Sequence, residues 1–139
     1  MKSPYEKLDG IVYFPRMLEK IRMHANGELP AEYIPYLGIG FDGRCLKFLK
    51  VDYEALKEKV LCGLSDIEIV EWCKKQGFLR TDEEKLIWNE FMTKRGWRDS
   101  GPEVNAFREY KEKYGYGNRD DIETYFDFFD IDEGRAKSG

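Results

Sequence analysis

The chain has 139 residues and a formal net charge of −4, with 42% hydrophobic and 36% charged residues. This length is typical of one domain with a substantial core. No apolar run approaches the roughly 20 residues that a membrane-spanning helix needs. Glu6 and Asp9 precede any hydrophobic stretch, so we expect neither a membrane segment nor a secretory signal. The mildly acidic total disfavours duplex DNA as a partner.

The cysteines favour a reducing, cytoplasmic location. Cys45, Cys62 and Cys73 are odd in number and form no CxxC pair, whereas disulfide frameworks and zinc sites need paired spacings. His24 is the only histidine, and nothing in the sequence places a thiol near it. The acidic stretch 127–133 does not give an EF-hand loop its glycine and glutamate. We therefore predict no metal and no cofactor.

Helix start and stop signals predict an all-α fold. Ser65-x-x-Glu68 and Thr81-x-x-Glu84 are capping boxes, in which a hydroxyl and a carboxylate satisfy free backbone N–H groups. Glycines end the apolar-periodic stretches at Gly27, Gly63, Gly77, Gly96 and Gly115. We predict a compact single helical domain over residues 1–139, with six or seven short helices and an aromatic-rich core. Residues 1–13 form an N-terminal lead-in and residues 134–139 a flexible tail.

In the first half of the chain, a helix is predicted from Phe14 to Asn26. Its buried stripe follows the helical period at Phe14, Met17, Leu18, Ile21 and Ala25. Prolines and glycines preclude a long helix over residues 27–41, but this segment is apolar, so we expect it to pack on the domain or to cover something. A short helix follows Asp42, and Asp52 caps the next one, which ends near Cys62.

In the second half, the helix over 66–76 is apolar nearly all round and is predicted to lie near the centre of the fold. The helix over 82–95 is predicted to bury Ile87, Trp88, Phe91 and Met92. Pro102 begins another, with Val104, Phe107 and Tyr114 facing inward. The last helix, at about 121–131, carries Ile122, Tyr125, Phe126 and Phe129 at helical spacing.

Two segments are candidates for binding an anion. Arg16, Lys20 and His24 follow one another at i, i+4 and i+8 on one flank of the first helix, where they could hold a carboxylate or phosphate. The alternative is a solvated face that pairs with Glu19 and other carboxylates. At Phe41–Cys45, Asp42 and Gly43 could open a helix N-terminal anion site, and a thiol beside Arg44 could have a lowered pKa. The alternative there is an N-cap, a turn glycine and a small buried cysteine.

A third candidate lies in residues 94–119, where cations alternate with rings at Lys94–Arg98 and Lys113–Arg119. This combination suits stacking on unpaired bases, a protein interface, or ordinary packing between helices. The net charge of these residues is +3, and that of residues 120–133 is −7, so the two neighbouring blocks are expected to neutralise each other.

Several segments in order resemble a family of uncharacterised bacterial domains, DUF5069. The similar segments are Ser3-Pro4, Asp9-Gly10, Phe14-Pro15-Arg16, Lys20-x-Arg22, Phe41-Asp42, Leu46-x-Phe48, Val51-Asp52, Asp66-x-Glu68-Ile69-x-x-Trp72 and Phe126-Asp127-x-x-Asp130-x-Asp132-Glu133-Gly134-Arg135. The resemblance implies a small bacterial cytosolic protein and supplies no activity, catalytic residue or binding residue.

The residues favour a non-enzymatic binding module that recognises a protein or an anionic small molecule through the first helix and segment 27–44. Its candidate binding residues are Arg16, Lys20, His24, Asp42 and Arg44. One alternative is a small enzyme with a cleft formed by Asp42, Arg44 and first-helix residues. A second alternative is single-stranded nucleic-acid binding through residues 94–119. The oligomeric state is not determined by these patterns.

Overall fold

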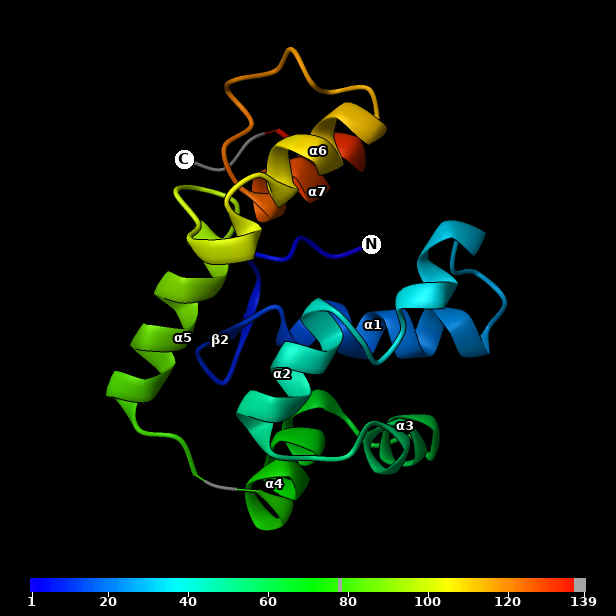
Figure 1. The fold of residues 1–139 in the computed structure, drawn as a ribbon. Coiled ribbons are helices and arrows are strands. Elements are labelled where there is room, and N and C mark those ends of the chain that lie inside the picture. Colours follow the sequence, from blue (N-terminus) through cyan, green and yellow to red (C-terminus); the bar gives the residue numbers. More distant parts are fainter. Residues whose placement is uncertain (78, 137–139) are drawn as a thin grey trace.

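Helices make up most of the chain in the computed structural model, which describes residues 1–77 and 79–136 (Figure 1). This confirms the predicted all-α class and its aromatic-rich core. Of the tail predicted to be flexible, residues 137–139 lie outside the described residues. Arg135, by contrast, is held by hydrogen bonds that it donates to the Met1 carbonyl oxygen (2.7 Å) and to Asp130 Oδ1 (2.6 Å).

The N-terminal lead-in contains a small antiparallel hairpin of β1 (Lys7–Leu8) and β2 (Ile11–Val12). Asp9 and Gly10 connect the strands with φ angles of 53° and 74°, as a tight hairpin turn with two left-handed central residues requires. The Asp9-Gly10 turn therefore reverses the chain and brings β2 alongside β1.

The first helix, α1 (Phe14–Ala25), begins with Pro15 in its first turn, where a proline loses no hydrogen bond. Tyr13 precedes it with a φ of 73°, an uncommon conformation for a residue with a side chain. Met17, Leu18 and Ile21 are buried as predicted and face the main core. The following segment holds the 3-10 helix η1 (Ala31–Tyr36).

Three helices follow, each with a terminus that local chemistry explains. Helix α2 (Phe41–Leu49) starts after Gly40, so Asp42 lies in its first turn and is not its N-cap. Helix α3 (Tyr53–Leu61) begins where the Asp52 side chain accepts a hydrogen bond from the Ala55 N–H, as predicted. Helix α4 (Asp66–Gln76) begins at the predicted Ser65–Glu68 capping box.

Helix α5 (Asp82–Lys94) begins at the predicted capping box of Thr81 and Glu84 and fastens the hairpin to the domain. The Trp88 indole N–H donates to the Val12 carbonyl oxygen (3.1 Å). Asn89 accepts a hydrogen bond from the Val12 N–H (3.0 Å) and donates one to the Gly10 carbonyl oxygen (2.8 Å). One side of α5 therefore completes the hydrogen bonding of the hairpin.

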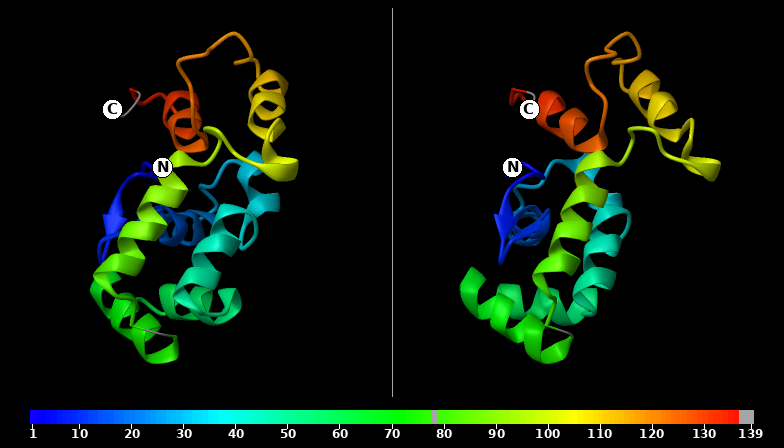
Figure 2. Two further views of the ribbon diagram at one scale, coloured as in Figure 1. Left: turned by 60° about the vertical axis from the view of Figure 1, so that its left-hand side comes forward. Right: turned by 90° about the vertical axis from the view of Figure 1, so that its left-hand side faces the viewer.

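The C-terminal region consists of the 3-10 helix η2 (Gly101–Glu103), α6 (Ala106–Lys113) and α7 (Tyr125–Asp132). Helix α7 begins later than predicted because Thr124 caps it by accepting from the Asp127 N–H (3.1 Å). Lys111 is buried and donates to the carbonyl oxygens of Arg119 and Ile122, which fixes the connection between α6 and α7. Figure 2 shows α6 and α7 at one end of the molecule and α3 and α4 at the other.

Some predicted burial is wrong, because helical periodicity does not reveal which side receives a neighbour. Helix α4 lies at an end of the molecule (Figures 1 and 2), and its Ile67 is 74% exposed while Ile69 is buried. On α5, Trp88 and Met92 are buried, whereas Ile87 is exposed. The other residues predicted to be buried but found exposed are Ala25, Phe91, Val104 and Tyr114.

Candidate functional site

Two cations of α1 point into the protein instead of into solvent. Arg16 is 2% exposed and Lys20 is 4% exposed, so the alternative of a solvated face is wrong for both. Carboxylates from α2 and from the end of α7 meet them, and these lie far away in sequence. His24, two turns further along α1 than Arg16, is exposed. The predicted flank of three groups is therefore a buried pair and a surface histidine.

Arg16 forms a two-point ion pair with Glu133, which follows α7. Its Nη1 donates to Glu133 Oε1 (2.8 Å) and its Nη2 to Oε2 (2.7 Å), the geometry for which a guanidinium is shaped. The Tyr33 hydroxyl donates to the same carboxylate (2.7 Å). Burial alone would raise the pKa of Glu133, but the hydrogen bonds and charge of Arg16, with help from Tyr33 and Arg135, lower it. The Arg16 guanidinium lies 5.0 Å from the ring centroid of Phe129.

Lys20 belongs to a second buried polar cluster, which joins α1 to α2. Its Nζ donates to Asp42 Oδ1 (3.0 Å), and the Tyr13 hydroxyl donates to the same oxygen (2.6 Å). Asp42 Oδ2 accepts from the Gly38 N–H (3.0 Å), so both oxygens of the buried carboxylate are satisfied. Burial lowers the pKa of Lys20 against the opposing pull of Asp42. Burial and the Asp42 charge raise the pKa of Tyr13 well above its ordinary value.

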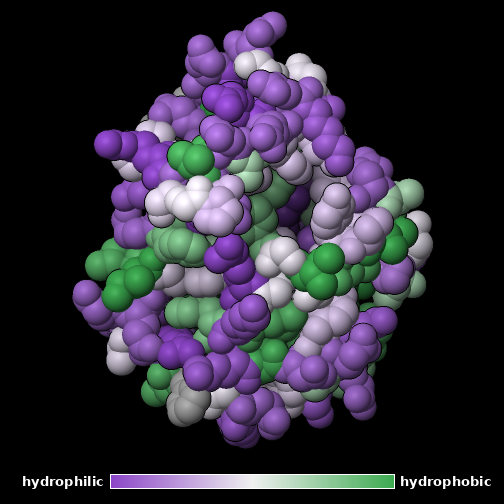
Figure 3. Space-filling model, in the orientation of Figure 1, coloured by the Kyte–Doolittle hydropathy of each residue, from purple (hydrophilic) through white to green (hydrophobic). Residues whose placement is uncertain are grey.

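The two clusters lie beside a cavity of about 260 Å³ that both Arg16 and Lys20 line. Its walls are mostly aromatic. The side formed by α1, η1 and α2 contributes Tyr13, Tyr33, Tyr36 and Phe41, and the side formed by α6 and α7 contributes Tyr110, Tyr114, Tyr125, Phe128 and Phe129. Figure 3 shows the surface hollowed between these two sides, with the colour of hydrophilic residues at the bottom of the hollow. We refer to this cavity as the aromatic pocket.

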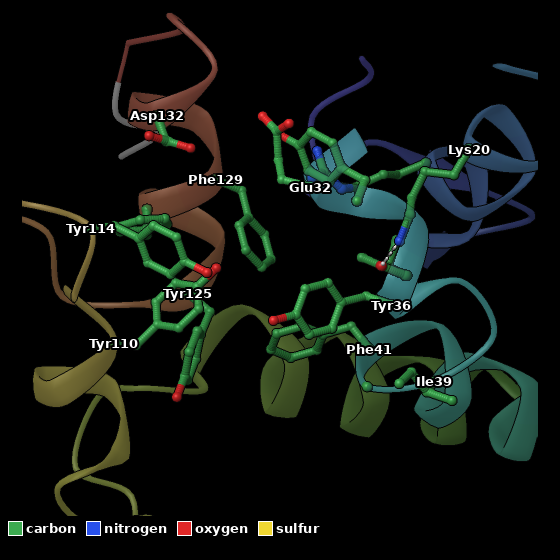
Figure 4. A pocket seen from close by; sticks show the side chains of 15 residues that line it. Lys20, Glu32, Tyr36, Ile39, Phe41, Tyr110, Tyr114, Tyr125, Phe129 and Asp132 are labelled. Atoms are coloured by element: carbon green, nitrogen blue, oxygen red, sulfur yellow. Dashed lines mark hydrogen bonds between the residues drawn. The ribbon is translucent and has the colours of Figure 1, made fainter. Parts of the chain in front are cut away.

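Phe41 and Phe129 connect the rings of the two sides. The ring centroid of Phe41 lies 5.5 Å from that of Tyr125 and 5.7 Å from that of Phe129, in edge-to-face contacts. Figure 4 shows the labelled rings of α6 and α7 facing Lys20, Tyr36 and Phe41 across the pocket. These contacts hold the walls in place, so the aromatic pocket is already formed in the structure.

The pocket also has two acidic side chains, Glu32 on η1 and Asp132 at the end of α7. Both residues are exposed, and Figure 4 shows their carboxylates at the same end of the pocket, on opposite sides. Asp132 Oδ1 accepts a hydrogen bond from the Tyr116 hydroxyl (3.1 Å). Anionic groups therefore lie at the rim, and the two buried cations lie against the walls.

One polar group in the pocket lining stands out. The Nε–H of Arg16 is buried and has no hydrogen-bond partner among the described residues. A buried donor of this kind costs about 1–3 kcal/mol when it stays unpaired. The side chain that carries this donor also lines the aromatic pocket.

Three of the predicted residues lie apart from the pocket lining: His24, which is exposed, Asp42 and Arg44. Asp42 lies behind Lys20 and reaches the pocket only through it. Arg44 is exposed, and its guanidinium lies 5.4 Å from the ring centroid of Phe91 on α5. The neighbouring Cys45 is fully buried, as the interpretation of a small buried cysteine expects, and burial raises its pKa well above the ordinary value, so the alternative of a lowered thiol pKa is wrong.

The cations of residues 94–119 mostly have partners. Lys94 pairs with Glu90, and Arg95 pairs with Asp99 (3.0 Å). Arg119 forms a two-point ion pair with Asp121, which agrees with the expected neutralisation between the two charge blocks. Trp97 is 45% exposed. Nucleic-acid binding by this segment stays a prediction.

Sequence reasoning missed most of the aromatic wall. The sequence predicts that Tyr114 faces inward and singles out neither Tyr110 nor Phe128, because periodicity cannot show that two helices leave a space between themselves and a segment some 80 residues earlier. The signals that did point to the pocket were the apolar composition of 27–41, which contributes Tyr33, Tyr36 and Ile39, and the unusual cations of α1.

Over residues 1–77 and 79–136, no group of three His, Cys, Asp or Glu side chains converges as a metal site would require. In the same residues no helix has the length and apolarity needed to span a bilayer. The chemical features of the pocket are its aromatic rings, its two buried ion pairs and its acidic rim.

Comparison with known families agrees with the segment-by-segment resemblance. Residues 1–135 match the family described as Domain of unknown function (DUF5069), and this match includes every residue of the aromatic pocket. The comparison with curated proteins gives no match. Because the match spans nearly the whole length, the chain belongs to the DUF5069 family.

Proposed function

We propose that this protein binds a small ring-containing molecule in the aromatic pocket, with a hydrogen-bond acceptor of the molecule directed at Arg16 and Lys20. The observation that carries the proposal is an aromatic pocket that meets two buried cations, one of which has an unpartnered Nε–H. Small-molecule sites are typically concave and apolar with a few fixed polar groups, and this pocket has that composition.

The size of the pocket limits the ligand. An apolar cavity of roughly 150 Å³ accommodates benzene, so 260 Å³ leaves room for one ring with a short side chain or for two fused rings. Flat molecules suit the walls best, because aromatic rings pack in stacked or edge-to-face arrangements. The concave shape favours a small molecule over a protein segment as the partner.

The polar groups of the pocket define the acceptor. Arg16 is already paired with Glu133, and Lys20 with Asp42, so neither cation brings an uncompensated positive charge. What they offer is spare N–H donors: the Nε–H of Arg16, and the third ammonium proton of Lys20, which donates to Asp42 and Tyr13 among the described residues. A carbonyl or phenol oxygen satisfies such donors, so an uncharged acceptor is preferred to a free anion.

We further propose that the protein works in the cytosol. Cys45, Cys62 and Cys73 are all free thiols, and Cys62 is exposed. Free exposed thiols are typical of reducing compartments. The bacterial origin implied by the family resemblance fits the same setting.

The test is ligand-observed NMR and thermal shift with a panel of one-ring and two-ring compounds that carry a carbonyl, phenol or carboxylate group. We expect binding to the wild type and loss of binding in Ile39→Trp, which adds a ring at an exposed position of the pocket lining. Ile67→Trp is the matched control, because Ile67 is exposed on α4 away from the pocket. Absence of binding across the panel, or unchanged binding by Ile39→Trp, would contradict the proposal.

A further inference from the structure

We infer that the ligand is a small aromatic amine, whose cationic nitrogen lies at the rim of the aromatic pocket between the carboxylates of Glu32 and Asp132. The inference rests on the proposed function and adds the charge of the ligand to it. It comes from the position of these two residues, one on each side of the pocket and both at the same end (Figure 4).

The charges of the pocket do not cancel. Arg16 and Lys20 are each neutralised by a buried carboxylate, Glu133 and Asp42 respectively. Among the described residues, the Glu32 carboxylate forms no hydrogen bond or ion pair, and Asp132 has only the Tyr116 hydroxyl on one oxygen. The rim therefore carries two uncompensated negative charges, which attract a cation and repel an anion.

The aromatic walls reinforce the same preference. A cation within about 6 Å of a tyrosine or phenylalanine ring centroid is attracted by the negative face of the ring, and ammonium ligands are commonly held by clusters of such rings. Tyr33 and Tyr36 lie on the same 3-10 helix as Glu32, and Phe129 lies on the same helix as Asp132. An amine at the rim thus meets carboxylates and ring faces together.

A competing explanation is that Glu32 and Asp132 serve only to keep the rim hydrated. Exposed carboxylates are common on soluble proteins and usually recognise nothing. The two explanations differ in one measurable respect: only a recognition site distinguishes an amine from a neutral molecule of the same shape.

Tyramine and 4-ethylphenol make this comparison, because they share a phenol and a two-carbon side chain and differ by the amino group. By isothermal titration calorimetry at about 20 mM salt, we expect tyramine to bind about tenfold more tightly. The difference should shrink at about 300 mM salt, where exposed charges are screened. It should also disappear in Glu32→Gln/Asp132→Asn, while the affinity for 4-ethylphenol stays the same.

The matched control is Glu28→Gln/Glu54→Gln, which removes the same number of exposed negative charges outside the pocket lining. It should keep the tyramine preference. The inference is overturned if the wild type binds both compounds equally, or if the preference for tyramine survives the rim substitutions. In either case, binding of 4-ethylphenol still upholds the proposed function. If neither compound binds, or if Ile39→Trp binds both as the wild type does, the inference and the pocket as a phenol site fail together.

Discussion

The ammonium of Lys20 lies 3.0 Å from Asp42 Oδ1, and both side chains are almost completely excluded from solvent. Breaking a buried ion pair by removing one partner leaves an uncompensated charge and costs about 3–5 kcal/mol. We expect Lys20→Met to lower the free energy of unfolding by this amount in denaturant titrations. In an Asp42→Asn background the same change should cost less, because no buried carboxylate is left without its cation.

Together these variants of Lys20 and Asp42 form a double-mutant cycle. The ion pair of Lys94 and Glu90 is its control, since both side chains are more than half exposed. Lys94→Met should cost little, and equally little in a Glu90→Gln background. Additive effects at Lys20 and Asp42 would show that their ion pair does not couple them.

The lowered pKa of Glu133 predicts a specific loss of stability in acid. The folded state holds this proton less tightly than the unfolded state, whose carboxyl titrates near the ordinary value of 4.5. The contribution of Glu133 is therefore present above pH 4.5 and is lost as the pH falls through its folded pKa. Glu133→Gln should lower the melting temperature at pH 7 and flatten its dependence on pH below about 5.

Thermal melts between about pH 7 and pH 3 check this prediction. Glu28→Gln changes an exposed residue and should leave the pH profile as it is in the wild type. A Glu133→Gln profile parallel to that of the wild type would mean that the ion pair with Arg16 does not contribute to acid stability.

Gly77 is required by a close approach of two chain segments. A Cβ on Gly77 would lie 2.1 Å from the Leu49 carbonyl oxygen, which no rotation of a side chain relieves. We expect Gly77→Ala to cost about 1–3 kcal/mol or more, as inserted atoms do in packed interiors. Gly43→Ala, inside α2 with only an ordinary contact at 3.5 Å, should be neutral or slightly stabilising. The check is to compare the denaturant midpoints of the two variants. Equal midpoints for Gly77→Ala and Gly43→Ala would disprove the prediction.

The three thiols should differ sharply in reactivity. Cys62 is exposed, whereas Cys45 and Cys73 are buried, and burial raises the pKa of Cys73 to about 12. Because the thiolate is the reactive form, a disulfide reagent such as Ellman's should modify Cys62 alone in the native protein. All three should react in denaturant. Cys62→Ser should abolish the fast phase, and a fast phase that remains in this variant would contradict the burial of the other two.

Helix boundaries were largely predictable because their signals are local. Ser65 with Glu68, and Thr81 with Glu84, lie within one turn, and both capping boxes are present as expected. Helix α1 begins at the predicted Phe14 and ends within one residue of the predicted Asn26. Local hydrogen bonds among neighbours in sequence are sufficient to determine such features.

The pocket was not predictable in the same way, because the partners that bury its cations lie far along the chain. Arg16 meets Glu133, and Lys20 meets Asp42, so a helical wheel of α1 alone made them look exposed. The wheel correctly grouped Arg16 with Lys20, but their burial depends on tertiary contacts. The same holds for Tyr114, which the sequence predicts to face inward, and for Tyr125, because no local signal shows the space that their rings face.

The ion pair between Arg16 and Glu133 also has a consequence for synthesis in the cell. Residue 16 leaves the ribosome long before residue 133, so for most of translation the guanidinium has no carboxylate to meet. Contacts that link distant segments form late in folding. A nascent chain therefore has no complete binding cavity, and ligand should not bind until the last turn of α7 has left the ribosome.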